Sequence, residues 1–149
     1  SHYLNTAADA CRFIDEVGLP NCKVHLDTFH MIREEDDMAE AIRMTGSRLG
    51  YFHACGSQRG IAGRDMVPWD ATFQALKDIG YDSTIGVESF NPGIERLAGL
   101  VCIWRDYAES PEALARESLK FLRAKHAEIY FGNASTCESC GAAHAACTC

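Results

Sequence analysis

Residues 23–31 have the sequence KVHLDTFHM. A short apolar run, typical of a buried strand, is followed by Asp27 and His30 at the point where that strand should end in a turn. An Asp at the end of a strand is commonly a turn former or a helix cap. A carboxylate and an imidazole at a strand tip are also groups from which a site is built, so the rest of the chain decides between the two interpretations.

The composition is that of an ordinary globular protein of one domain. The chain has 149 residues, of which 47% are hydrophobic and 23% are charged, and this length can bury a sizeable core. Its formal net charge of −7 argues against a nucleic-acid partner, which requires clustered Lys and Arg. No apolar run approaches the roughly 18 residues of a membrane span, and no signal-peptide pattern opens the chain. We therefore expect a cytoplasmic protein with no membrane partner.

Helical and strand patterns alternate along the chain. Apolar spacing predicts helices over residues 6–17, 33–47, 69–80, 91–108 and 111–125, and strands over residues 22–27, 48–54 and 83–89. Alternation of this kind builds right-handed βαβ units, so the expected fold is α/β with a parallel sheet covered by helices. An α/β domain over residues 1–125 is expected to be followed by a disordered, Cys-rich tail over residues 126–149, because this segment is small, polar and low in complexity.

The carboxyl ends of the three predicted strands carry side chains that belong together chemically. In parallel α/β folds the functional site lies at this edge of the sheet. The first strand ends at Asp27, the second at His53 and the third at Glu88. Taken singly, they read as a turn former, a core residue and a solvent-facing residue. Together, two carboxylates and an imidazole suit Mn²⁺, Mg²⁺ or Co²⁺, so a divalent-metal site is favoured over three independent structural roles.

Four motifs carry a resemblance to a known family: LDTFHM (26–31), GYFHACGSQRG (50–60), GRDMVPW (63–69) and GVESF (86–90). They resemble the D-tagatose/D-psicose (allulose) 3-epimerase family, and more broadly the xylose-isomerase-like sugar isomerases and epimerases built on a (β/α)₈ barrel. The resemblance runs from about Tyr3 to Leu122. It implies metal-dependent epimerisation of a ketose at C3 through a cis-enediolate. A free sugar is expected rather than a phosphorylated one, because the strand ends carry no Gly-rich phosphate-binding loop and no cluster of Lys and Arg.

The resemblance also implies a role for individual residues. Asp27, His53 and Glu88 match three of the four metal ligands, with Mn²⁺ as the expected metal. Glu88 further matches one of the two carboxylates that move the proton at C3. His30 matches a histidine that hydrogen-bonds the sugar substrate, and Arg59 matches an arginine that reaches a substrate hydroxyl. The full-length protein is expected to form a homo-oligomer.

The number of predicted strands limits what this chain is expected to do. A closed (β/α)₈ barrel has eight strands and about 250 residues, whereas three strands are predicted here. We therefore expect the last three βα units of an incomplete barrel, without one metal ligand and one catalytic Glu, and inactive alone. A catalytically inactive scaffold that binds sugar or a partner chain is one alternative. The loop GSQR (56–59), where ketose 3-epimerases commonly carry Glu and Asn, leaves a related sugar or hydroxypyruvate isomerase as another.

The eight cysteines fall into two groups. Those within the periodic segments, Cys11, Cys22, Cys55 and Cys102, are interpreted as reduced, buried small hydrophobic residues. The other four lie in the predicted tail, where C-x₂-C, His144 and C-x-C resemble a zinc knuckle. The spacers between these residues are short and consist largely of Ala and Gly. A bound zinc ion would therefore have few side chains around it to organise into a folded module.

Overall fold

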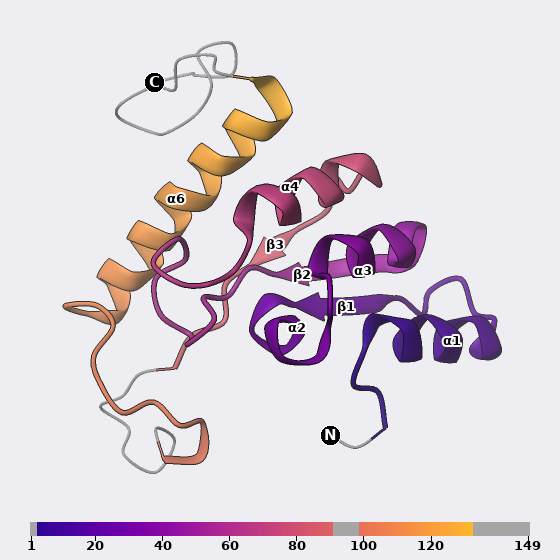
Figure 1. Cartoon of the computed structure of the whole chain (residues 1–149), viewed down its shortest axis with the longest axis horizontal. Helices are drawn as coiled ribbons and strands as arrows, with labels where there is room; N and C mark the ends of the chain where they lie inside the picture. Colours follow the sequence, from indigo (N-terminus) through magenta and orange to yellow (C-terminus); the bar gives the residue numbers. More distant parts are fainter. Residues whose placement is uncertain (1–2, 91–98, 133–149) are drawn as a thin grey trace.

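The computed structural model describes residues 3–90 and 99–132. Within these residues, three strands form one parallel sheet in the order β1 (Val24–Asp27), β2 (Leu49–His53) and β3 (Ile85–Gly86). The strands run in the same direction, so their carboxyl ends meet at one edge of the sheet (Figure 1). This is the parallel α/β sheet that the sequence predicted, and it is not closed.

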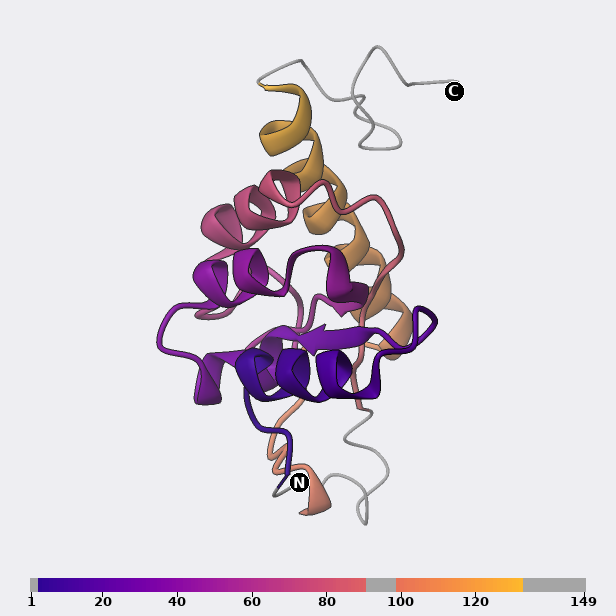
Figure 2. The same ribbon diagram turned by 90° about the vertical axis from the view of Figure 1, so that its right-hand side faces the viewer.

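Helices cover one side of the sheet (Figures 1 and 2). The helices α1 (Ala7–Val17), α3 (Met38–Thr45), α4 (Trp69–Asp78) and α6 (Pro111–Phe131) pack against one another in chain order. The largest fully buried hydrophobic side chains in the core are Phe52, Phe73, Ile42 and Leu76. Burial of a side chain of this size stabilises the fold by about 1.5–3 kcal/mol, and this layer fixes the strands whose ends carry the candidate site.

Local capping defines the helix ends. Thr6 Oγ1 accepts a hydrogen bond from the Asp9 amide at 3.2 Å, and the Asp9 carboxylate accepts one from the Thr6 amide at 3.4 Å, which is a capping box. Gly18 ends α1 with φ of 64°, a left-handed conformation that glycine adopts without a steric penalty. Asp37 caps α3 and Ser110 caps α6, each by accepting from a backbone N–H.

Several element bounds differ from the prediction. A short helix, α2 (Thr28–Glu34), follows β1 directly where the sequence indicated a turn. The next helix therefore begins at Met38 and not at residue 33, and a 3₁₀ turn, η1 (Gly46–Arg48), leads from it into β2. The third strand is reduced to two residues because only Ile85 and Gly86 pair with β2.

The C-terminal part also differs. Of the helix predicted over residues 91–108, residues 91–98 lie outside the described residues, and the backbone of 103–110 is not helical. The last helix, α6, continues to Phe131, past the predicted domain boundary at residue 125. The remainder of the predicted tail, from residue 133 and with all four of its cysteines, lies outside the described residues. No helix within the described ranges is long and apolar enough to cross a membrane.

Candidate metal centre

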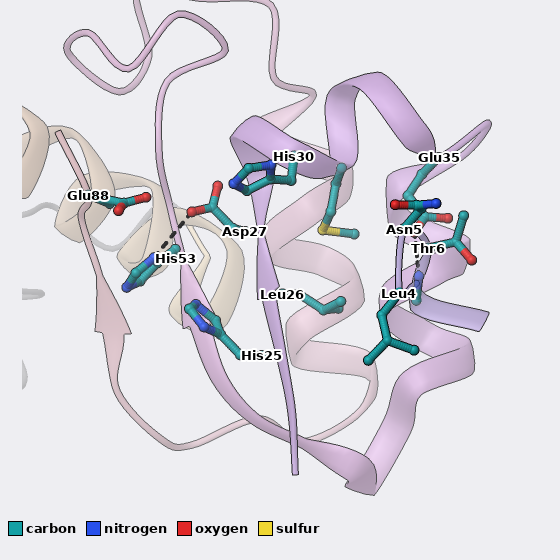
Figure 3. Close-up of a pocket in the computed structure, with 12 residues that line it drawn as sticks. Leu4, Asn5, Thr6, His25, Leu26, Asp27, His30, Glu35, His53 and Glu88 are labelled. Carbon is teal, nitrogen blue, oxygen red and sulfur yellow. Dashed lines mark hydrogen bonds and ion pairs between the residues drawn. The ribbon is translucent and has the colours of Figure 1, made fainter. Parts of the chain in front are cut away.

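Four side chains gather at the carboxyl edge of the sheet. Asp27 ends β1, His53 ends β2, and Cys55 and Glu88 each lie two residues beyond the end of a strand. Their ligand atoms all lie within 4.8 Å of one another. Figure 3 shows Asp27, His53 and Glu88 directed toward a common centre. The register brings the three predicted ligands together, because it pairs Asp27 with His53 and His53 with Gly86.

Asp27 serves the fold and the site at once. Its Oδ1 accepts a hydrogen bond from the Phe29 amide at 2.8 Å, which caps α2. Its Oδ2 lies 3.1 Å from His53 Nδ1 and 3.6 Å from Cys55 Sγ. The side chain is only 8% exposed. The helix-cap interpretation is therefore correct, and it uses one carboxylate oxygen while the other faces the cluster.

Aromatic contacts hold the imidazole of His53. Its ring packs edge-on against His25, with centroids 4.3 Å apart, and against Tyr51, with centroids 5.0 Å apart. These residues alternate along β1 and β2 with the buried Leu26 and Phe52, so they project from the sheet face opposite the helices. The simple interpretation of His53 as a buried core residue is wrong, because its side chain is 19% exposed and faces Asp27.

Arg59 connects the third strand end with α2. One guanidinium nitrogen, Nη1, is paired with the Glu88 carboxylate, and Nη2 lies 3.3 Å from His30 Nε2. The guanidinium stacks on the ring of Phe29 at 3.9 Å and on that of Phe90 at 4.7 Å. Arg59 is 5% exposed. The structure therefore brings Arg59 into contact with the predicted ligand Glu88, and His30 into contact with Arg59.

The backbone of Arg59 is strained. Its φ of 61° lies in the left-handed region, which is uncommon for a residue with a long side chain and costs of order 1–3 kcal/mol. The loop around it is braced by Asp65, which accepts hydrogen bonds from the Gly63 and Val67 amides and from Trp69 Nε1, and burial raises the pKa of Asp65. The loop thus keeps a strained residue aimed at Glu88.

Cys55 is the member of the cluster that sequence reasoning missed. It was interpreted as packing, and its side chain is indeed fully buried. However, its Sγ accepts a hydrogen bond from the Glu88 amide at 3.2 Å and lies beside Asp27 Oδ2. Burial, followed by the Asp27 charge, raises the pKa of Cys55 to about 12. The signal in the sequence is its position two residues after His53, which places it at the same end of the second strand.

The other cysteines differ from one another. All four within the described residues are free thiols. Cys11 is buried as predicted, but Cys22 is half-buried and Cys102 is exposed, so the expectation of burial is wrong for Cys102. Cys102 lies in a turn directly after helical residues 99–100, and not within a helix as expected.

A pocket of about 420 Å³ opens beside the cluster. Its polar lining comes largely from His25, Asp27, His30, His53 and Glu88, and part of its wall comes from the segment before α1. A volume of this order accommodates a small polar molecule. The cluster thus lies on the wall of a cavity and is not sealed in the core.

The donor set fits a divalent cation of the hard or borderline class. Asp27 and Glu88 bring two carboxylates close together at a partly buried position, and like charges at such a position are costly unless a cation offsets them. Arg59 pairs with Glu88, whereas the partners of Asp27 Oδ2 within the described part of the chain are the His53 imidazole and the Cys55 thiol. Two carboxylates with one imidazole is a set suited to Mn²⁺, Mg²⁺ or Co²⁺.

Residues 1–125 match the family described as the xylose isomerase-like TIM barrel. The chain belongs to this family. It is 38% identical over 128 residues to L-ribulose 3-epimerase from Methylomonas sp. (strain DH-1), a match that covers 85% of this chain and 45% of the relative.

Solved structures give the same relationship. A structure of L-ribulose 3-epimerase superposes with a TM-score of 0.82 at 37% identity and covers 89% of this chain and 46% of that one. D-allulose 3-epimerase from Methylomonas sp., in complex with D-allulose, superposes with a TM-score of 0.78 at 37% identity, over 84% of this chain and 44% of that one. The chain spans less than half the length of these relatives.

Proposed function

We propose that the strand ends of this chain form part of a site that binds a divalent cation and a ketose, and that this site serves epimerisation of the ketose at C3. The observation that carries the proposal is that the ligand atoms of Asp27, His53 and Glu88 lie within 4.8 Å of one another at one edge of the sheet. Arg59 contacts Glu88, and His30 contacts Arg59. The similarity to ketose 3-epimerases supports the choice of reaction.

Asp27, His53 and Glu88 would hold the cation, and Mn²⁺ is the metal we propose. A divalent cation supplies a Lewis acid that polarises the substrate carbonyl and offsets the negative charge that develops as the adjacent proton leaves. The described residues provide the anchoring for this role: Asp27 through its cap of α2, and His53 through its packing on His25 and Tyr51.

Glu88 is the proposed acid/base group at C3, since its carboxylate is 36% exposed and borders the pocket. Proton abstraction next to a carbonyl requires a carboxylate within hydrogen-bond reach of the C–H. Arg59, in the loop after β2, would orient this carboxylate through their ion pair. Its contact with His30 of α2 would hold the Arg59 and His30 side chains on the side of the substrate. His30, which is exposed on the pocket wall, is positioned to donate a hydrogen bond to a sugar oxygen.

Epimerisation at C3 needs a second carboxylate that returns a proton on the opposite face of the sugar. Within the described residues of the cluster, the other carboxylate is Asp27, and its two oxygens are engaged by the α2 cap and by His53. We propose that the 149-residue chain by itself binds cation and sugar without measurable turnover. The runner-up function is isomerisation of a related sugar. The loop after β2 supports this second function in part. Ser57 donates a hydrogen bond to Gln58 Oε1, and Gln58 Nε2 donates one to the Arg64 carbonyl, so neither side chain is directed into the cluster.

The test is whether bound Mn²⁺ and a ketose lie at the same site. Mn²⁺ is paramagnetic, so it broadens the ¹H and ¹³C resonances of a sugar held next to it. We expect the chain with Mn²⁺ to broaden L-ribulose or D-psicose resonances more than Mn²⁺ alone does, and we expect His53→Ala to remove the effect. Glu34→Gln, at an exposed position of α2, is the matched control. Equal broadening by wild type and His53→Ala would contradict the proposal.

A further inference from the structure

The strand that delivers Glu88 is too short to hold it. β3 pairs with β2 only at Ile85 and Gly86, and one further bond runs from the Ala54 amide to the Gly86 carbonyl at 2.8 Å. Glu88 lies beyond these bonds, with a side chain that is 36% exposed. The main-chain ladder therefore fixes Asp27 and His53 directly but leaves Glu88 to be positioned by other contacts.

Cys55 supplies one of these contacts. Its Sγ accepts a hydrogen bond from the Glu88 amide at 3.2 Å, and the same thiol is directed at Asp27 Oδ2 at 3.6 Å. One side chain thus joins a residue of the first strand end to a residue of the third, across the second strand that lies between them. It is fully buried, so water does not compete for either contact.

Thr28 in turn fixes Cys55. Thr28 Oγ1 accepts a hydrogen bond from the Cys55 amide at 2.8 Å and donates one to the Cys55 carbonyl at 2.5 Å. Thr28 is fully buried as the first residue of α2, directly after Asp27. The chain of contacts Thr28–Cys55–Glu88 therefore links the three strand ends side by side, beyond the point where their backbone ladder stops.

We propose that Thr28 and Cys55 are positioning residues that set the separation of the metal ligands Asp27 and Glu88. The inference rests on the proposed function for the identity of the ligands, but the contacts themselves exist without a metal. Cys55 acts here through its hydrogen bonds and not as a metal ligand. Partners that orient ligands in this way typically contribute 10- to 100-fold, as an order of magnitude, to metal affinity.

The test uses two readouts on the 149-residue chain with Cys55→Ala, Cys55→Ser and Thr28→Val. The first is the hydrogen-exchange rate of the Glu88 amide by NMR in metal-free protein. The second is Mn²⁺ affinity by titration. Cys11→Ala, which removes another buried thiol that is not part of the cluster, is the matched control, and circular dichroism checks that each variant is folded.

We expect Cys55→Ala to speed exchange of the Glu88 amide by about tenfold or more and to weaken Mn²⁺ binding by about 10- to 100-fold. Cys55→Ser keeps a donor and an acceptor on a shorter side chain and should restore part of both. Thr28→Val keeps the shape but loses the hydroxyl, so it should loosen Glu88 to a smaller degree than Cys55→Ala. Cys11→Ala should change neither readout.

The outcomes separate this inference from the function on which it rests. Unchanged Glu88 exchange and unchanged Mn²⁺ affinity in folded Cys55→Ala, with wild type binding Mn²⁺, would overturn the positioning role alone. No Mn²⁺ binding by wild type would overturn the proposed function and the positioning role with it, even if Glu88 exchange rises. A sulfur-to-cobalt charge-transfer absorption in Co²⁺-loaded wild type that Cys55→Ala abolishes would replace positioning by direct ligation.

Discussion

Replacing Glu88 with alanine removes the carboxylate that pairs with buried Arg59. The Arg59 side chain is 6% exposed, so the cation keeps little water, and its remaining contacts are His30 and the rings of Phe29 and Phe90. Breaking a fully buried ion pair costs about 3–5 kcal/mol, whereas an exposed pair contributes about 1 kcal/mol or less. Because Glu88 is 36% exposed, we expect Glu88→Ala to lower the free energy of unfolding by about 2 kcal/mol.

The assay is urea denaturation in EDTA, followed by circular dichroism, for a double-mutant cycle with Arg59→Met. Methionine keeps an unbranched apolar stem over the two rings but removes the charge. Once the cation is gone, loss of the carboxylate should cost little, so we expect the double variant to be more stable than additivity predicts by about 1 kcal/mol. Glu34→Ala at an exposed position of α2 controls for loss of a surface carboxylate. A Glu88→Ala effect below about 0.5 kcal/mol, or strict additivity, would show that Glu88 does not stabilise the buried Arg59 cation.

The helix cap and the thiols lead to three further expected outcomes. Thr6→Ala removes the capping-box hydroxyl of α1 and should lower the free energy of unfolding by about 1 kcal/mol in the same assay. Hydrogen bonds from Thr6 and Arg12 hold the pKa of Asp9 below its usual value. The ionised carboxylate therefore stabilises the fold at pH values above its unfolded-state pKa, and this contribution is lost as the pH falls through the lower folded-state pKa. Thr6→Ala removes one of these hydrogen bonds, so the stability of the variant should fall less steeply in acid than that of the wild type. A thiol with a pKa of about 12 is ionised in about one molecule in 10⁴ at pH 8, so iodoacetamide should label exposed Cys102 and leave Cys55 unmodified until the chain is unfolded. Mass spectrometry of the peptides measures the extent of labelling at each cysteine, and equal labelling of Cys102 and Cys55 in the folded chain would contradict the burial of Cys55.

The parts of the fold that the sequence predicted are those with a strong local signal. The order of strands and helices follows from hydrophobic periodicity, and the rule that parallel strands present their carboxyl ends at one edge was enough to bring Asp27, His53 and Glu88 together. The short helix α2 was missed because seven residues provide too few turns for periodicity to stand out. The one signal for this helix is Asp27, because Asp is a common N-cap residue. The sequence alone does not distinguish an N-cap from a turn former at this position.

The parts that could not be predicted depend on tertiary contacts. The left-handed backbone of Arg59 and its stacking between Phe29 and Phe90 join segments that are far apart along the chain. The contact of Cys55 with the Glu88 amide likewise depends on where the third strand stops pairing. Strand propensity over residues 83–89 carries no information on which residues find a partner, because pairing requires a neighbouring strand.

Direct titration with Mn²⁺, with free ion counted by electron paramagnetic resonance, tests whether the strand ends bind a divalent cation. We expect the wild-type chain to bind one Mn²⁺, and Asp27→Asn, His53→Ala and Glu88→Gln each to weaken this binding by roughly tenfold or more, since each removes one donor of the set. Glu34→Gln should bind as wild type does. If the wild-type chain binds no Mn²⁺, or binds it as tightly after all three residues are replaced, the strand ends are not a metal centre.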